Sequence, residues 1–409
     1  MRRIFILFVL LGLPQLVAET WTSPATGQTI TLQLLAPIPE PPPLIPVPVV
    51  FYLTNLAVPR TGTDSDEVIL RDLRTEGYLV VVLDYARHSR ARVPFLNRDL
   101  VELRRQLQKK ILLSDRVIDS AHIFIVPSGH RLKRDIVYYR DAARTLAMDL
   151  IYPSKPAQPV GTVLEFSCDN ANRMGNSSLD SCSDTILPGA AVEGFAVAMA
   201  DHPVAAPYAG FDTMPDCARK IKAAVRTLRA ESTALGSNGR IVPVGFSRGS
   251  GMALMLATTA GRPELDGFGE HEGEPSNVQG AVVMSGRFTY LDLLPNDKMV
   301  PHYVQTWGER ATHENTWRAH GALDYLSQPA GIPLFLTINA SESPDALHQM
   351  EVLRQRLTKL GSPFVFEPEL EPRGHKMPLD LVVLKKLFSY LHTQLSVAPE
   401  RPPAPSPQS

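Results

Sequence analysis

The sequence is poor in cysteine, with only Cys168, Cys182 and Cys217 among its 409 residues. Three thiols allow at most one internal disulfide, and they form no Cys/His spacing typical of a zinc site. A bridge between Cys168 and Cys182 would close a short loop and contribute about 3 kcal/mol to stability. The alternative is that all three thiols stay reduced. We therefore predict no metal site and leave the pairing of the cysteines open.

An excess of charge of one sign is also lacking. Lysine and arginine together number 41 and aspartate and glutamate 42, so the formal net charge is −1 at pH 7. A balanced chain has no electrostatic footprint for nucleic acid or for an anionic membrane surface. Beyond the first residues, no apolar run approaches the roughly 20 residues that span a bilayer. We therefore expect neither nucleic acid nor stable membrane insertion.

The N-terminal stretch has the composition of a secretory signal peptide. Arg2 and Arg3 precede a short apolar run over residues 4–13, and the small residue Ala18 ends the segment. This arrangement predicts cleavage after Ala18 and export, so that the mature protein is secreted or periplasmic. The alternative is a membrane anchor, which the short length of the apolar run disfavours.

Apolar strand-like runs alternate with helical stretches from residue 49 onward. Examples are "VVFYL", "EVILRDLRTEG" and "YLVVVLDYA", and a further helix is predicted at about 97–108. The segments "DIVYY" and "TLAMDLIYP" predict a hairpin, and the later strand-like runs are continuously apolar. Such runs between helices are typical of a mostly parallel sheet covered on both faces. The predicted parts are a signal peptide at 1–18, an N-terminal α/β extension with a proline-rich start at 19–125, an α/β catalytic domain at 126–396 and a disordered proline-rich tail at 397–409.

One short motif carries the strongest chemical signal. The segment "RIVPVGFSRGSGMALMLA" places Ser247 between Gly245 and Gly249, after a strand-like run and before a run of helix formers. Small neighbours relieve the crowding of a sharp strand-to-helix turn, which presents the serine hydroxyl at a helix N-terminus where negative charge is favoured. This context predicts a nucleophilic serine. The alternative is that the glycines serve only a tight turn.

A nucleophilic serine needs a base, and the base needs an acid that orients it. The loop after "IPLFLTIN" carries Glu342 and Asp345, of which the length of the strand favours Glu342 as the acid. Either carboxylate can instead cap the following helix, and Asp345 suits that role well. The loop in "ELEPRGHKMPLD" carries His375, which lies between the last predicted strand and the last predicted helix. The alternative for His375 is a solvated loop residue.

Residues 130–395 resemble the α/β-hydrolase superfamily of esterases, lipases and prolyl-oligopeptidase-like peptidases. The resemblance rests on "GFAVAMADHP", "VGFSRGSG", the Glu342 loop and "RGH". It implies an α/β-hydrolase fold with an eight-stranded, mostly parallel sheet and helices on both faces. It also implies that Ser247 is the nucleophile, His375 the general base and Glu342 the acid, with no metal or organic cofactor.

The same resemblance implies an oxyanion hole made of two backbone N–H groups. One belongs to Arg248, and the other belongs to Ser167 or Cys168, where many of these esterases have a His-Gly-Gly stretch. Side chains at those two positions restrict the backbone more than glycine does. Arg248 also resembles the arginine that follows the serine in glucuronoyl esterases. That likeness predicts a role toward an acidic sugar or an oxyanion, and the alternative is a solvated arginine.

These residues predict an exported serine esterase that cleaves a small-molecule or polymer-linked ester, with an acylated carbohydrate as one candidate. Two alternatives stay open: a prolyl-oligopeptidase-like serine peptidase, and an inactive binding protein on the same scaffold. The segment at 290–326, where the family inserts its cap, carries Tyr303, Trp307 and Trp317. These rings are predicted either to line an acyl or sugar pocket or to pack locally.

Overall fold

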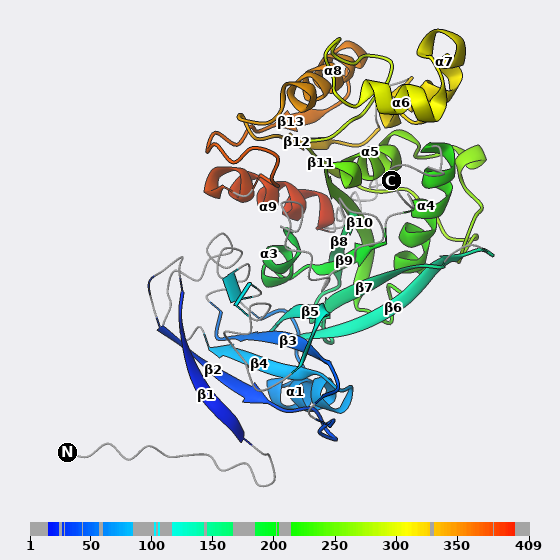
Figure 1. Ribbon diagram of the computed structural model, residues 1–409. Coiled ribbons are helices and arrows are strands. Elements are labelled where there is room, and N and C mark those ends of the chain that lie inside the picture. Colours follow the sequence, from blue (N-terminus) through cyan, green and yellow to red (C-terminus); the bar gives the residue numbers. More distant parts are fainter. Residues whose placement is uncertain are drawn as a thin grey trace, which may run out of the picture.

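The chain forms a mixed α/β fold with two β-sheets, one of five strands and one of eight, in the residues that the structure describes. The structure is a computed structural model (Figure 1). It describes residues 15–23, 27, 29–42, 44–56, 60–84, 102–103, 105–106, 117–142, 145–166, 185–201, 203, 214–327, 331–378 and 380–396.

The first sheet comes from the N-terminal part of the chain and has the order β1-β2-β4-β3-β5. Its strands and helix are β1 (Gln15–Thr22), β2 (Thr29–Leu35), β3 (Val47–Thr54), α1 (Asp66–Thr75), β4 (Leu79–Asp84) and β5 (Ile118–Pro127). Strands β3, β4 and β5 are parallel, whereas β2 is antiparallel to β1 and to β4. The sequence predicted β3, α1 and β4, but it did not predict β1, β2 or β5. The helix predicted at about 97–108 lies mostly outside the described residues.

Strand β1 crosses the predicted cleavage point after Ala18. Residues 19–22 pair with β2 in one continuous register, and an irregularity in the pairing separates them from Leu16. Trp21 belongs to this second half of the strand and is buried in the core of the sheet. Cleavage after Ala18 would therefore leave the half of β1 that carries Trp21 paired with β2.

The second sheet has the order β13-β12-β11-β10-β8-β9-β7-β6. Its strands are β6 (His130–Arg140), β7 (Thr145–Pro153), β8 (Val160–Phe166), β9 (Ala196–Ala200), β10 (Ser237–Phe246), β11 (Ala281–Met284), β12 (Leu334–Thr337) and β13 (Phe364–Phe366). The strands from β8 to β13 are parallel, whereas β7 is antiparallel to both β6 and β9. The hairpin predicted from "DIVYY" and "TLAMDLIYP" is the β6–β7 pair.

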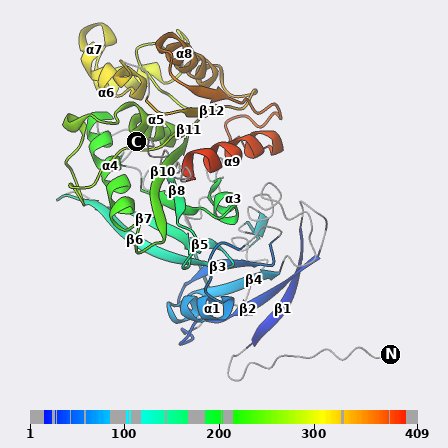
Figure 2. The same cartoon turned by 180° about the vertical axis from the view of Figure 1, so that it is seen from behind.

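Helices cover both faces of this second sheet, as the opposite views of Figures 1 and 2 show. One face carries α3 (Leu187–Val192) and α9 (Leu381–Leu395), and the other carries α4 (Met214–Ala230), α5 (Arg248–Thr258) and α8 (Pro344–Leu360). Successive strand residues alternate between the two cores, since Val163 packs on the α3–α9 side and Leu164 on the α4–α5 side. Burial of both faces explains why these strands are continuously apolar in sequence.

The connection from β11 to β12 contains α6 (Val300–Trp307), α7 (Arg310–Ala319) and a short 3-10 turn (Ala322–Tyr325). The helices α6 and α7 lie together beyond the edge of α5 (Figure 1). Another 3-10 turn (Pro263–Leu265) follows α5. Among the described residues, no helix combines the length and the apolar character needed to cross a bilayer.

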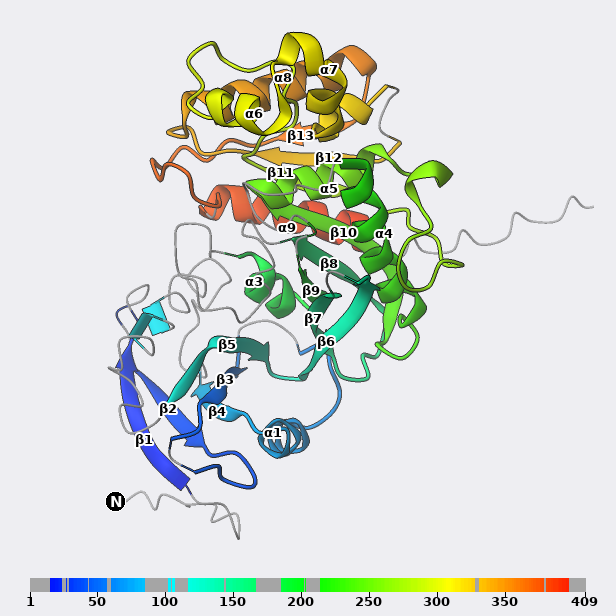
Figure 3. The same ribbon diagram turned by 45° about the vertical axis from the view of Figure 1, so that its right-hand side comes forward.

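The two sheets share one hydrophobic core. Buried residues of β3, β4 and β5 belong to the same cluster as α3, α9 and one face of the second sheet, and α3 lies between the two sheets (Figure 3). Ion pairs add to this contact, because Arg131 on β6 lies 2.9 Å from Asp64, just before α1, and 3.0 Å from Asp72 in α1. The domain boundary predicted after residue 125 falls inside β5.

Candidate active site

The strand-to-helix turn at Ser247 has the backbone conformation that its sequence predicts. Strand β10 ends at Phe246, α5 begins at Arg248, and Ser247 between them has φ 54° and ψ −117°, a conformation that is strained for a residue with a side chain. A Cβ on Gly245 would overlap the backbone of Gly249, so glycine is required there. The N–H of Ser247 donates to the carbonyl oxygen of Ser285 at 2.7 Å, which holds the turn against the end of β11.

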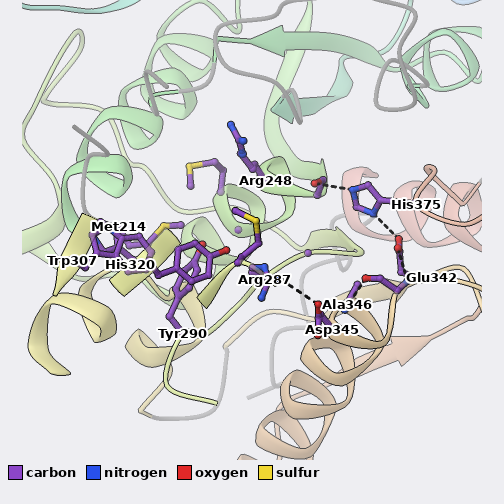
Figure 4. A pocket seen from close by; sticks show the side chains of 17 residues that line it. Met214, Arg248, Arg287, Tyr290, Trp307, His320, Glu342, Asp345, Ala346 and His375 are labelled. Atoms are coloured by element: carbon purple, nitrogen blue, oxygen red, sulfur yellow. Dashed lines mark hydrogen bonds and ion pairs between the residues drawn. The ribbon is translucent and has the colours of Figure 1, made fainter. Parts of the chain in front are cut away.

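Three side chains from distant parts of the sequence form one hydrogen-bonded chain (Figure 4). The ring of His375, in the β13–α9 connection, has its Nε2 atom 3.1 Å from Ser247 Oγ and its Nδ1 atom 2.7 Å from Glu342 Oε2. Glu342 follows β12, so the three residues come from loops at the ends of neighbouring parallel strands. The Phe246 ring packs against the His375 ring, with the two ring centroids 4.9 Å apart.

The carboxylate of Glu342 is buried but well supplied with donors. It is 5% exposed and accepts hydrogen bonds from the Ser343 N–H and from Ser285 Oγ, each at 2.8 Å, in addition to its contact with His375. Burial by itself would raise the pKa of Glu342, but the bonds from His375, Ser343 and Ser285 outweigh it and hold that pKa below the usual value. Glu342 is therefore ionised at neutral pH.

The two carboxylates that the sequence left as alternatives, Glu342 and Asp345, make different contacts. Glu342 contacts His375, whereas Asp345 lies in the first turn of α8, one of its oxygens 3.8 Å from Arg287. Ser343 is the N-cap of α8 and accepts from the Ala346 N–H. Asp345 thus lies where a carboxylate stabilises the start of a helix.

Sequence reasoning missed Ser285. This residue is fully buried, has φ 37°, and touches two members of the hydrogen-bonded chain: its carbonyl accepts from Ser247 and its hydroxyl donates to Glu342. A Cβ on the next residue, Gly286, would overlap the Ser250 hydroxyl and the Ser247 carbonyl. The available signal was the polar "SG" pair directly after the continuously apolar strand β11, at the edge where the other site residues also follow their strands.

A cavity of about 500 Å³ opens beside Ser247 and extends away from His375 (Figure 4). Its lining, besides the three hydrogen-bonded residues, is Met214, Arg248, Gly251, Met252, Gly286, Arg287, Tyr290, Met299, Tyr303, Trp307, His320, Ser343, Asp345 and Ala346. Two of the three predicted aromatic residues, Tyr303 and Trp307, line the cavity. The third, Trp317, is buried behind them, 5.5 Å from the Trp307 ring.

An ion pair lies in the wall of this cavity. The guanidinium of Arg287 makes two contacts with the carboxylate of Asp297, one of them at 2.9 Å, and the Asp297 side chain is only 1% exposed. Burial by itself would lower the pKa of Arg287, but the hydrogen bond to Asp297 and the charge interactions with Asp297, Tyr303 and Tyr290 together outweigh it and raise this pKa. Arg287 therefore stays charged and fixed in the wall.

Of the residues predicted to form the oxyanion hole, the structure describes Arg248 but not the other two. Arg248 is the first residue of α5, so its N–H belongs to the first turn of that helix, and its side chain is exposed at the cavity. Ser167 and Cys168 lie outside the described residues, as does Cys182, so the cysteine pairing stays a prediction. Cys217 is buried in α4. Among the described residues, no group of three or more metal-binding side chains gathers at one point.

No protein-family model matches the sequence, and no curated protein matches it. Two solved structures share its fold over 64% of this chain. One is described as a truncated form of a carbohydrate esterase from gut microbiota, with 16% identity, a TM-score of 0.53 and 95% of that chain covered. The other is a bifunctional GH43-CE protein of Bacteroides eggerthii, with 19% identity, a TM-score of 0.53 and 38% of that chain covered. The likeness at these identities is one of fold.

Proposed function

We propose that this protein is a serine esterase of the α/β-hydrolase superfamily. The observation that carries the proposal is the hydrogen-bonded chain of Ser247, His375 and Glu342 at the mouth of a cavity. Such a chain is the arrangement by which a base activates a serine and an acid orients the base. The fold shared with a carbohydrate esterase supports the same reading.

In this proposal His375 Nε2 removes the proton of Ser247 Oγ as the oxygen attacks the ester carbonyl. The buried, ionised Glu342 keeps the Nδ1 proton of His375 on its own side of the ring and stabilises the imidazolium that forms. His375 then protonates the leaving alcohol, and an acyl group stays on Ser247. Water, activated by the same ring, releases the acid and restores the serine.

The tetrahedral oxyanion needs donors in this proposal, and the start of α5 supports one of them. The N–H of Arg248 belongs to the first turn of α5, where the helix dipole favours negative charge. The second donor is the backbone of Ser167 or Cys168, directly after β8. A polar part of the substrate would pass the side chain of Arg248, which is exposed at the cavity.

The proposed substrate is an ester of a carbohydrate or of another bulky alcohol, processed outside the cytoplasm. The open side of the site supports this choice, because the side chain of His375, which must face the leaving alcohol, is 43% exposed. A large alcohol, including one attached to a polymer, meets little obstruction there. Export rests on the N-terminal segment with Arg2, Arg3 and the apolar run.

The test is labelling of the folded full chain with a fluorophosphonate, with the modified residue located by mass spectrometry. We expect label on Ser247 in the wild type and none in Ser247→Ala. The matched control is Ser389→Ala, which removes an exposed hydroxyl on α9 and should keep the label. Turnover of an ester and its amide analogue then separates an esterase from a peptidase. A folded protein without label on Ser247 would overturn the proposal.

A further inference from the structure

The position of His375 gives the cavity a direction, if the proposed function is right. The proton carried by His375 Nε2 goes to the leaving oxygen, so the alcohol part of an ester must lie on the His375 side of Ser247. The cavity extends to the other side, where Tyr290, Trp307 and His320 are found (Figure 4). The acyl part is the part that enters the cavity.

The far end of the cavity is built from flat rings. Tyr303, Trp307 and His320 form a parallel stack, with ring centroids 4.8 Å and 4.2 Å apart and planes within 3° and 11° of each other. Tyr290 stands across this stack, at 85° to Tyr303 and 87° to Trp307. Trp317 lies behind Trp307 and closes the cluster. The result is a wall of packed aromatic rings at this end of the cavity.

Two arginines, Arg248 and Arg287, line the cavity, whereas its aromatic end is neutral. Arg287 lies between Ser247 and the rings, but Asp297 and Asp345 accompany it. Burial lowers the pKa of His320 to about 4, so this ring is uncharged at neutral pH. Among the described residues, a carboxylate that reached the stacked rings would therefore find no cationic side chain in the stack.

We propose that the cavity selects an aromatic acyl group, so that the preferred substrate is the ester of an uncharged aromatic carboxylic acid with a bulky alcohol. Aromatic rings pair favourably with the faces and edges of other rings, and methionine sulfur makes favourable contacts with them. Met214, Met252 and Met299 complete the lining. An acetyl group would leave most of the 500 Å³ empty, and a long alkyl chain would contact the wall without any pairing between aromatic rings.

The test compares esters that differ in one part only. Ethyl acetate, ethyl hexanoate and ethyl cinnamate share the alcohol, and 2-phenylethyl acetate carries its ring on the alcohol side. The measured quantity is the ratio of kcat/KM for ethyl cinnamate to kcat/KM for ethyl hexanoate. We expect a ratio of about ten in the wild type, from ring contacts that an alkyl chain lacks. The kcat/KM for ethyl cinnamate should also exceed the kcat/KM for 2-phenylethyl acetate.

Variants assign that ratio to the wall. Trp307→Ala and Tyr290→Leu should each lower it about tenfold. Tyr290→Leu serves where truncation of the more deeply buried Trp307 prevents folding, because Tyr290 is less buried and leucine still fills part of its space. The matched control is Tyr139→Leu, which removes a half-buried ring on β6 outside the cavity and should leave the ratio unchanged.

The outcomes separate this inference from the proposed function. Fluorophosphonate label on Ser247 together with a ratio below one, or a ratio that neither variant changes, overturns the aromatic acyl assignment and leaves the esterase proposal standing. A preference for 2-phenylethyl acetate over ethyl cinnamate overturns the direction assigned to the cavity. Absence of label on Ser247 in a folded protein overturns the proposed function itself.

Discussion

The buried carboxyl of Glu165 leads to a prediction about stability and pH. Glu165 lies one residue before the end of β8, is 3% exposed, and accepts hydrogen bonds from Thr185 Oγ1 at 2.6 Å and from the Ile186 N–H. Burial raises the pKa of Glu165 to about 8, even though both hydrogen bonds act to lower it. The two hydrogen bonds link the end of β8 to the residues that precede α3.

The magnitude follows from proton linkage. Between its ordinary pKa of 4.5 and about 8, Glu165 is ionised in the unfolded chain but protonated in the folded one. The folded state then binds more protons, so the free energy of unfolding falls as pH rises, by about 1.4 kcal/mol per unit and by about 3 kcal/mol in all between pH 5 and pH 8. Glu165→Gln removes this dependence, and loses about 1 kcal/mol because an amide nitrogen cannot accept a hydrogen bond.

We therefore expect Glu165→Gln to be about 1 kcal/mol less stable than the wild type at pH 5 and about 2 kcal/mol more stable than it at pH 8. The assay is urea unfolding of both proteins at the two pH values, with Glu371→Gln, which changes an exposed carboxylate, as the control. A difference between variant and wild type that is the same at both pH values would refute the reasoning.

Three further substitutions test the site and its support. Ser285→Ala removes a donor that lowers the pKa of Glu342, so the acid limb of the pH profile of kcat/KM should move to higher pH and kcat/KM at pH 7 should fall about tenfold; an unmoved limb would contradict this role. Gly245→Ala should lower the free energy of unfolding by about 3 kcal/mol in urea, and an unchanged midpoint would mean that the turn has room for a Cβ. Asp297→Asn unpairs the buried side of Arg287 and should destabilise by about 3 kcal/mol in the same assay, whereas a loss near zero would mean that solvent screens the pair.

Local patterns in the sequence predicted the parts of the fold in which neighbouring residues determine the structure. The strands β8 to β12 are continuously apolar because both faces of the sheet are buried. The turn at Ser247 depends on two nearby glycines. The choice between Glu342 and Asp345 was predicted less firmly, because it depends on where α8 begins. The structure has Ser343 as the N-cap, which puts Asp345 in the helix and leaves Glu342 free to face His375.

Features that depend on contacts between distant segments were not predicted. Strands β1 and β2 lie in a region whose apolar start resembles a signal peptide, and β5 pairs with β3 across about seventy intervening residues. The role of Ser285 arises only where the ends of β10, β11 and β12 meet. Whether an aromatic ring faces a cavity or the core also depends on packing, and it separates Trp317 from Tyr303 and Trp307.

The hydrophobic cluster that runs through both sheets makes the N-terminal segment part of the same folding unit as the second sheet. A chain shortened to begin at residue 126 would retain Ser247, Glu342 and His375, yet it would lose β3, β4 and most of β5 from that cluster. Apolar surface of α3 that now lies against β5 would face water. The N-terminal segment therefore cannot be gained or lost by recombination alone. Such a change would also require substitutions in the apolar surface that the segment covers.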